Sequence, residues 1–323
     1  MNQEGRLRAG WRLLFQFLLN YAGASLLGMV VLAAKAAGAT GGAPSPNLPV
    51  PVYAGTALVA TASVWFCGRF LDGRPFSGFG LRLDRAWWSD LGFGLLLGAL
   101  LMTGIFLAQL AAGWVTVTGS FVTAGAFFPA ILAPVALFVW VGFYEELVIR
   151  GYQLTNLAEG LNGTGLGPKG AIVLAWVLSS SLFAVLHLSN PDASALGTLN
   201  IFLAGTMLGT GYVLTGQLAI PIGLHTTWNL FQGNVFGFPV SGLDLTGATV
   251  LATRQTGPTV LTGGPFGPEA GLIAPAAMAL GVLLIALRVR RRTGKLSLHL
   301  PLAEGPFTGR QQGTMTEGST PGS

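Results

Sequence analysis

Two adjacent carboxylates, Glu145 and Glu146, lie at the end of a strongly apolar stretch of the sequence. Ionisable groups inside a membrane cost roughly 2.5–3.5 kcal/mol each on insertion scales, so solubility does not explain this pair. Glu146 and Arg150 are four residues apart, which places them on one helix face where they can pair. Glu145 points about 100° away and lacks that partner. We therefore expect one carboxylate held ionised by the arginine and a second that can serve as a general base.

Two of the three histidines also lie in apolar segments. His187 ends one of these segments, and His225 lies within another, followed four residues later by Asn229. Because His225 and Asn229 face the same side of a helix, they could present two hydrogen-bond donors to one developing oxyanion. The third histidine, His299, lies in the basic tail and is given no role.

Each of these residues also has a purely structural explanation. A histidine or asparagine in a membrane helix often makes a hydrogen bond between helices, and a Glu–Arg pair at this spacing is often only a structural pair. Nearly every ionisable residue of the apolar segments, however, falls in these three places. One shared polar site explains them together better than three separate packing contacts.

The composition places these segments in a membrane. The chain has 323 residues, of which 51% are hydrophobic and only 9% are charged, whereas soluble domains carry roughly 25% charged residues. The net charge of +5 does not indicate a nucleic-acid partner, because the basic residues cluster beside apolar runs as topology signals. Cys67 is the single cysteine, which excludes an internal disulfide and a cysteine-rich metal site.

Hydrophobic runs predict an all-α fold, a polytopic transmembrane bundle of about eight helices with an active-site cavity inside the membrane. The eight predicted spans are Trp11–Ala34, Val52–Gly68, Leu91–Trp114, Pro129–Tyr144, Ala171–Leu188, Leu199–Leu214, Leu218–Phe236 and Leu272–Leu287. Gly94 with Gly98, and Gly205 with Gly209, are spaced for close helix packing.

Positive charge predicts how the helices are oriented. With eight crossings and a cytoplasmic N-terminus, fifteen of the seventeen basic residues fall inside, and only Lys35 and Arg254 fall outside. We therefore expect a multi-pass protein of the plasma (inner) membrane with both termini cytoplasmic. The first apolar run is longer than the 7–15 residues of a signal-peptide core, which favours a retained helix over cleavage.

Four regions follow from this reading. Residues 1–128 hold the first three helices, and residues 129–236 form the helical core with the polar site. Residues 237–295 hold an external loop, Ser241–Glu269, and the last helix. Residues 296–323 are predicted to be a disordered cytoplasmic tail.

Three motifs in order resemble the CPBP family, the type II CAAX prenyl endopeptidases and bacteriocin-processing (Abi) proteins. They are Glu-Glu-x-x-x-Arg at 145–150, Phe-x-x-x-His at 183–187 and His-x-x-x-Asn at 225–229. The resemblance covers roughly Pro129 to Gln232, about a third of the chain. Each motif alone is weak, whereas the ordered set on successive membrane helices is fairly specific.

The resemblance implies a role for each residue. Glu145 would be the general base that activates water, held by His187, while His225 and Asn229 would stabilise the tetrahedral oxyanion. Glu146 and Arg150 would shape and brace the site. A metal-free mechanism is favoured; the alternative is zinc held by Glu145, His187 and His225, with the other glutamate as base.

The predicted topology sets a condition on this site. If the fourth helix ended at Tyr144, Glu145 would lie at the inner membrane face and His187 near the outer face. The two residues can meet only if the fourth helix continues through Arg150 to about Leu157. We therefore predict a long fourth helix and a water-filled cavity within the bilayer.

Three functional classes fit these observations. The favoured one is an intramembrane endopeptidase that cuts a membrane-associated peptide, either prenylated or of the leader type. A non-catalytic binding, scaffold or immunity protein could keep the same cavity. A proton-coupled transporter could use the carboxylates and histidines as a relay, although the sequence shows no internal repeat of the kind many transporters have. The expected partners are a peptide or protein substrate and the lipid bilayer.

Overall fold

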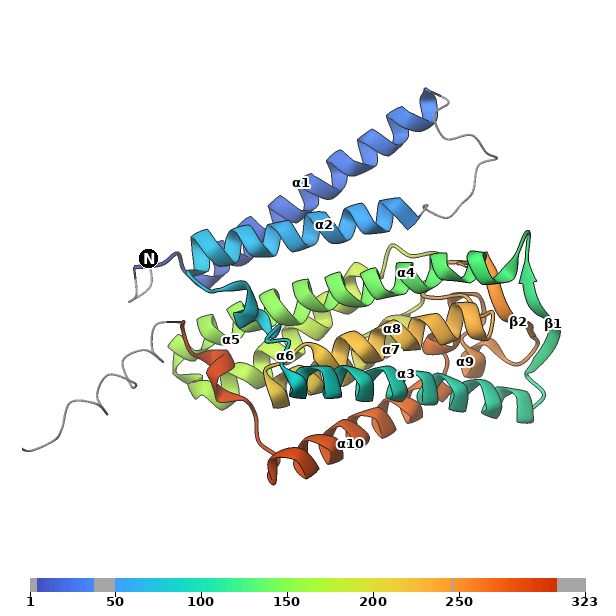
Figure 1. Ribbon diagram of the computed structural model, residues 1–323. Helices are drawn as coiled ribbons and strands as arrows, with labels where there is room; N and C mark the ends of the chain where they lie inside the picture. The colour runs from blue at the N-terminus through green and yellow to red at the C-terminus, as the bar shows by residue number, and fades with distance from the viewer. Residues whose placement is uncertain (1–4, 38–49, 246, 307–323) are drawn as a thin grey trace, which may run out of the picture.

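The computed structural model describes residues 5–37, 50–245 and 247–306. Most of these residues form helices that lie roughly side by side, as Figure 1 shows. The helices are α1 (Ala9–Ala36), α2 (Val50–Cys67), α3 (Arg85–Ala111), α4 (Phe127–Glu146), α5 (Thr155–Leu161), α6 (Gly167–Leu186), α7 (Ala195–Thr215), α8 (Ala219–Leu230), α9 (Thr259–Thr262) and α10 (Ile273–Thr293). The predicted helical membrane bundle is therefore confirmed.

Each of the eight predicted spans falls on one of these helices. Within the described residues, six helical stretches are long and apolar enough to cross a membrane. One of them, Phe127–Leu186, joins α4, α5 and α6, and it changes direction at Gly165, whose φ of 88° suits glycine. Helix α8 is too short to count, with 12 residues followed by a five-residue π-helical turn. The chain is an integral membrane protein, and eight crossings stay a prediction.

The predicted fourth helix begins as α4 and continues well past Glu146. Beyond Glu146 the chain continues in π-helical geometry over Leu147–Leu154 and then as α5 to Leu161. The predicted continuation past Arg150 is therefore confirmed. A π-helical segment widens the turn locally, and such segments occur frequently at functional sites.

Helix α8 lies at the centre of the bundle, between α3 and α4. Every residue from Ala219 to Trp228 is buried. Gly94 and Gly98 on α3 face the α8 backbone so closely that a methyl group at either position would collide with it. Gly205 and Gly209 on α7 pack in the same way against α6. The predicted packing role of both glycine pairs is confirmed.

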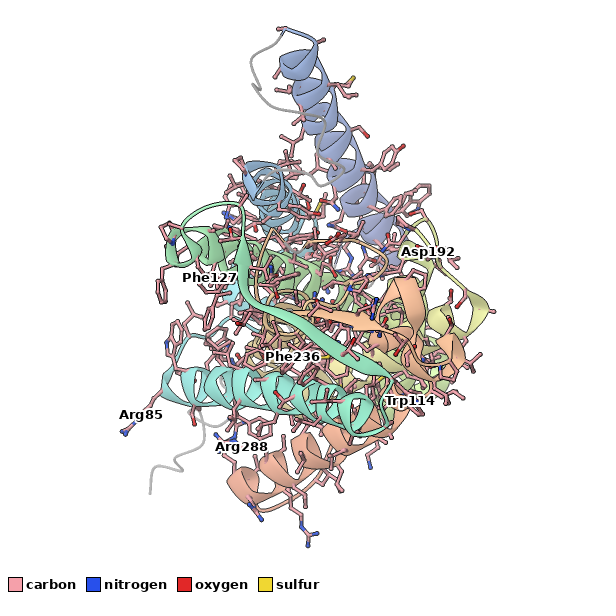
Figure 2. All side chains as sticks on the ribbon, turned by 90° about the vertical axis from the view of Figure 1, so that its right-hand side faces the viewer. Arg85, Trp114, Phe127, Asp192, Phe236 and Arg288 are labelled. Atoms are coloured by element: carbon pink, nitrogen blue, oxygen red, sulfur yellow. The ribbon has the colours of Figure 1, made fainter. Side chains whose placement is uncertain are left out.

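The segment Ser241–Glu269, which we expected to be an external loop, contains regular secondary structure. It contains β2 (Ala248–Gln255), which pairs antiparallel with β1 (Val115–Thr123). Figure 2 shows β1 crossing the end of the bundle from Trp114 to Phe127, between α3 and α4. Glu269 at the end of this segment is buried. Hydropathy did not reveal the ribbon because its two strands pair across a long sequence separation.

Part of the predicted disordered tail is ordered. Residues Leu300–Ala303 form a 3-10 helix, and Leu302 and Ala303 are buried against the α5 and α6 region. His299 donates its backbone N–H to the Val213 carbonyl. Residues 307–323 lie outside the described residues, as do residues 38–49 between α1 and α2.

Candidate active site

Three helices bring the predicted residues to one cavity. Glu145 comes from the end of α4, His187 follows the last residue of α6, and His225 and Asn229 lie on α8. All four line a cavity of about 370 Å³ between the helices. Small cavities lined by apolar walls and a few convergent polar groups are typical of ligand sites. The distance problem raised by the topology is therefore resolved by the long fourth helix.

Glu146 does not line this cavity but supports it from behind. Its Oε1 accepts a hydrogen bond of 2.8 Å from Arg150 Nη1 and another of 2.8 Å from His225 Nδ1. Arg150 also donates to the Gly205 carbonyl on α7 at 3.1 Å. Glu146 and Arg150 are both fully buried. These contacts join α4, α7 and α8 and fix the ring of His225, as expected for bracing residues.

Glu145 has a different environment from its neighbour. Its side chain is 22% exposed, and Tyr144 donates its hydroxyl to Glu145 Oε1 at 3.3 Å. The other oxygen, Oε2, lies 3.9 Å from His225 Nε2. The two carboxylates thus differ as expected: one is enclosed and paired with arginine, and the other faces the cavity.

The two histidines present the same nitrogen to the cavity. His187 Nδ1 lies 2.7 Å from the Phe183 carbonyl, and because a carbonyl only accepts, this nitrogen carries the proton. His225 Nδ1 donates to Glu146, as described above. In both rings Nε2 is left for a ligand, and a fixed tautomer of this kind is what a catalytic histidine needs.

Phe183, four residues before His187, packs against both histidines of the site. Its ring contacts His187 with centroids 4.6 Å apart and His225 with centroids 6.0 Å apart. The Arg150 guanidinium lies 4.5 Å from the centroid of the same ring. Phe183 therefore separates the two histidines and holds both in place.

Sequence reasoning missed several polar residues of this cavity. They are Asn20 on α1, Tyr53 on α2, Tyr144 on α4, and Asn190, Ser241 and Glu269 in connecting segments. Tyr144 directly precedes the Glu-Glu motif, and Asn190 lies three residues after His187. The remaining four lie outside the motif-bearing segments, so nothing in the local sequence connects them to the site.

The zinc alternative can be tested against the geometry. Glu145, His187 and His225 are suitable ligands in kind, and each histidine has its second nitrogen bonded to an oxygen, as zinc ligands often do. Across the described ranges, however, no group of three or more His, Cys, Asp or Glu side chains is placed to hold a metal ion. The donor types therefore suit zinc, and the choice between a metal-free site and a zinc site stays a prediction.

Comparison with known families supports the motif-based assignment. Residues 126–231 match the family model described as "Type II CAAX prenyl endopeptidase Rce1-like". No curated protein and no solved structure matches the chain. The matched segment contains α4 to α8, and therefore every residue of the three motifs. The predicted resemblance to the CAAX protease family is therefore confirmed over residues 126–231.

Proposed function

We propose that this chain is an intramembrane endopeptidase of the CAAX type, with Glu145 as the general base. The observation that carries the proposal is the convergence of Glu145, His187, His225 and Asn229, from three helices, on one cavity within the membrane bundle. The Rce1-like match over the same helices supports it.

Catalysis would begin with a water molecule beside Glu145. Glu145 accepts a proton as the water oxygen attacks the scissile carbonyl, and His187 Nε2 positions the water or the carboxylate. The carbonyl oxygen becomes an oxyanion, which the Asn229 amide and a protonated His225 Nε2 stabilise by donating hydrogen bonds. The oxyanion then re-forms a carbonyl as the C–N bond breaks, and Glu145 returns the proton to the leaving amine, which restores the Glu145 carboxylate.

Glu146 and Arg150 act through His225. Glu146 Oε1 accepts the hydrogen bond from His225 Nδ1 and so fixes the orientation of the ring, with Nε2 directed at the cavity. Arg150 donates to the same carboxylate oxygen and holds Glu146 in place. We therefore assign these two residues positioning roles and the other four direct roles.

The substrate class is part of the proposal. The family match suggests a peptide with a prenylated C-terminal CAAX sequence, and a membrane-associated leader peptide is the alternative. Purified protein in lipid nanodiscs should be offered both peptides, each quenched by an internal fluorophore pair. Cleavage of one should disappear in Glu145→Gln and in His187→Ala.

A matched control separates chemistry from damage to the fold. Asp192→Asn removes an exposed carboxylate near the site and should cleave like the parent protein. Equal cleavage by Glu145→Gln and the parent would refute the assignment of the base and would favour a non-catalytic binding role. Proton flux in proteoliposomes without peptide cleavage would favour the transporter class.

The metal question needs its own measurement. We propose that the site works without a metal, and zinc held by Glu145, His187 and His225 is the alternative. Dialysis against a chelator, with metal content measured before and after, should leave cleavage unchanged. Loss of cleavage that is restored by added zinc would replace the metal-free proposal with the zinc one.

A further inference from the structure

A tight turn that the motifs do not include, Val240–Leu243, forms part of the cavity wall. Val240 and Leu243 exchange two backbone hydrogen bonds of 2.9 Å each. The two central residues, Ser241 and Gly242, both have positive φ, of 49° and 79°, which is the pattern of a type I′ turn. Val240, Ser241 and Leu243 all line the cavity.

The turn is held down from two sides. Asn190, three residues after His187, donates its side-chain amide to the Ser241 carbonyl at 2.9 Å. On the opposite side Glu269 Oε1 accepts the Ser241 N–H at 2.5 Å and its hydroxyl at 3.3 Å. A non-glycine residue at positive φ is uncommon, so these contacts stabilise a conformation that Ser241 would not adopt readily alone.

Glu269 also reaches the end of α8. Its second oxygen, Oε2, accepts a hydrogen bond from the Gln232 side chain, and Gln232 lies three residues beyond Asn229. The same Gln232 amide donates to the Pro239 carbonyl at 2.6 Å. One buried carboxylate thus fastens both the segment entering the turn and the turn itself. A buried charge of this kind is costly, so a purely structural position would be filled more cheaply by a neutral residue.

We propose that the Val240–Leu243 turn is a lid on the cavity and that Glu269 is the positioning residue that holds it closed. The lid controls access of peptide and water to Glu145 and His187. It ties the loop after His187 to the helix end after Asn229, so that closing it sets the spacing of the site. The inference that the lid admits peptide rests on the proposed function, whereas the closure itself does not.

The test measures closure without measuring cleavage. Met207 lines the cavity and is 1% exposed, so a Met207→Cys variant in a Cys67→Ser background reports access to the interior. A charged methanethiosulfonate reagent should modify this cysteine about tenfold faster in Glu269→Ala, the change expected from losing a buried hydrogen bond to a charged group. Asp192→Asn should leave the rate unchanged.

Two further variants make the result decisive. Asn190→Ala removes a second side-chain tie and should also accelerate labelling, which decides the matter if Glu269→Ala does not fold. A reporter at exposed Thr118, Thr118→Cys, should react equally with and without Glu269→Ala, which shows that any acceleration is local. Unchanged labelling of Met207→Cys in folded Glu269→Ala or Asn190→Ala would overturn the lid.

Cleavage measured on the same proteins separates this inference from the proposed function. The lid variants should retain kcat within about threefold and alter KM, because they change access and not the reacting groups. If no variant and no parent cleaves any peptide, the proposed function fails while the labelling rates still decide the lid. If a lid variant is labelled faster but cleaves peptide with an unchanged KM, the lid does not control peptide entry.

Discussion

The two adjacent glutamates of the site make different contacts. Glu145 faces the cavity, while Glu146 faces Arg150 and His225, because adjacent helix positions point in different directions. The adjacency of the two glutamates therefore does not give them the same role. It lets one carboxylate react while the next fixes the ring of His225.

The buried pair of Glu146 and Arg150 gives a prediction about stability. Arg150→Met leaves Glu146 as an uncompensated buried charge and should reduce the free energy of unfolding by roughly 3–5 kcal/mol. The double variant Glu146→Leu with Arg150→Met removes both charges and should recover most of that loss. It should still cleave poorly, because His225 Nδ1 has lost its acceptor. Thermal unfolding in detergent, measured beside peptide cleavage, checks both effects.

A double variant that is no more stable than Arg150→Met alone would contradict this account. It would show that the destabilisation comes from lost packing against Phe183, over which the guanidinium lies. Restored cleavage in the double variant would show that His225 does not need Glu146.

Among the elements, α8 depends most on its neighbours. It carries His225 and Asn229, yet it is short and touches α3 and α4 through glycines. Gly98→Ala should therefore push α8 away from α3 and cost about 1–3 kcal/mol by overpacking. Gly104→Ala on the same helix is the matched control, since no atom lies within contact distance of its added methyl group. That change should be neutral or stabilising by up to about 1 kcal/mol.

Peptide cleavage distinguishes displacement of α8 from simple loss of stability. Cleavage at a temperature where both variants are folded should fall in Gly98→Ala and stay unchanged in Gly104→Ala. Equal cleavage by the two variants would mean that α8 keeps its place when the contact is tightened.

The elements also show how far local sequence could be taken. Apolar runs predicted the helices because a membrane span needs a long run of apolar residues. The ordered motifs predicted four of the cavity residues. The antiparallel pairing of Val115 with Gln255 joins segments far apart in the chain, and no local pattern records it. The sequence also did not predict the burial of Glu269. Its neighbourhood is rich in glycine and proline, which is typical of an exposed loop, and only the long-range packing buries it.

For the whole molecule, charged side chains hold the peripheral helix in place. No residue in the most apolar stretch of α1 is buried, although α1 packs along α2. Ion pairs add to this packing: Arg12 reaches Asp72 at 2.9 Å and Glu159 at 2.7 Å, and Arg6 reaches Glu159 at 2.6 Å. These ion pairs connect the N-terminal end of α1 to α5 and to the turn that follows α2.

Glu159→Gln tests this anchor. Removing the charge leaves Arg12 with one carboxylate instead of two, and α1 should separate from α5 more readily. A disulfide or short cross-link placed between the two helices should form more slowly, and any change in peptide cleavage should come through Asn20, the α1 residue that lines the cavity. Asp192→Asn is again the control. An unchanged cross-linking rate would show that the covering lipid, and not Glu159, holds α1.

The stability of the whole molecule should depend on pH through Glu269. Burial raises the pKa of Glu269 to about 7 from its usual value of 4.5, so the folded state binds a proton that the unfolded chain has released. The stabilisation is fully present below pH 4.5 and is lost as pH rises towards 7, by at most about 3 kcal/mol. Glu269→Gln should remove this dependence, and it should unfold at a higher temperature than the parent at pH 8 while matching it near pH 4.5. Unfolding curves that shift equally with pH in the parent and in Glu269→Gln would place the titrating group elsewhere.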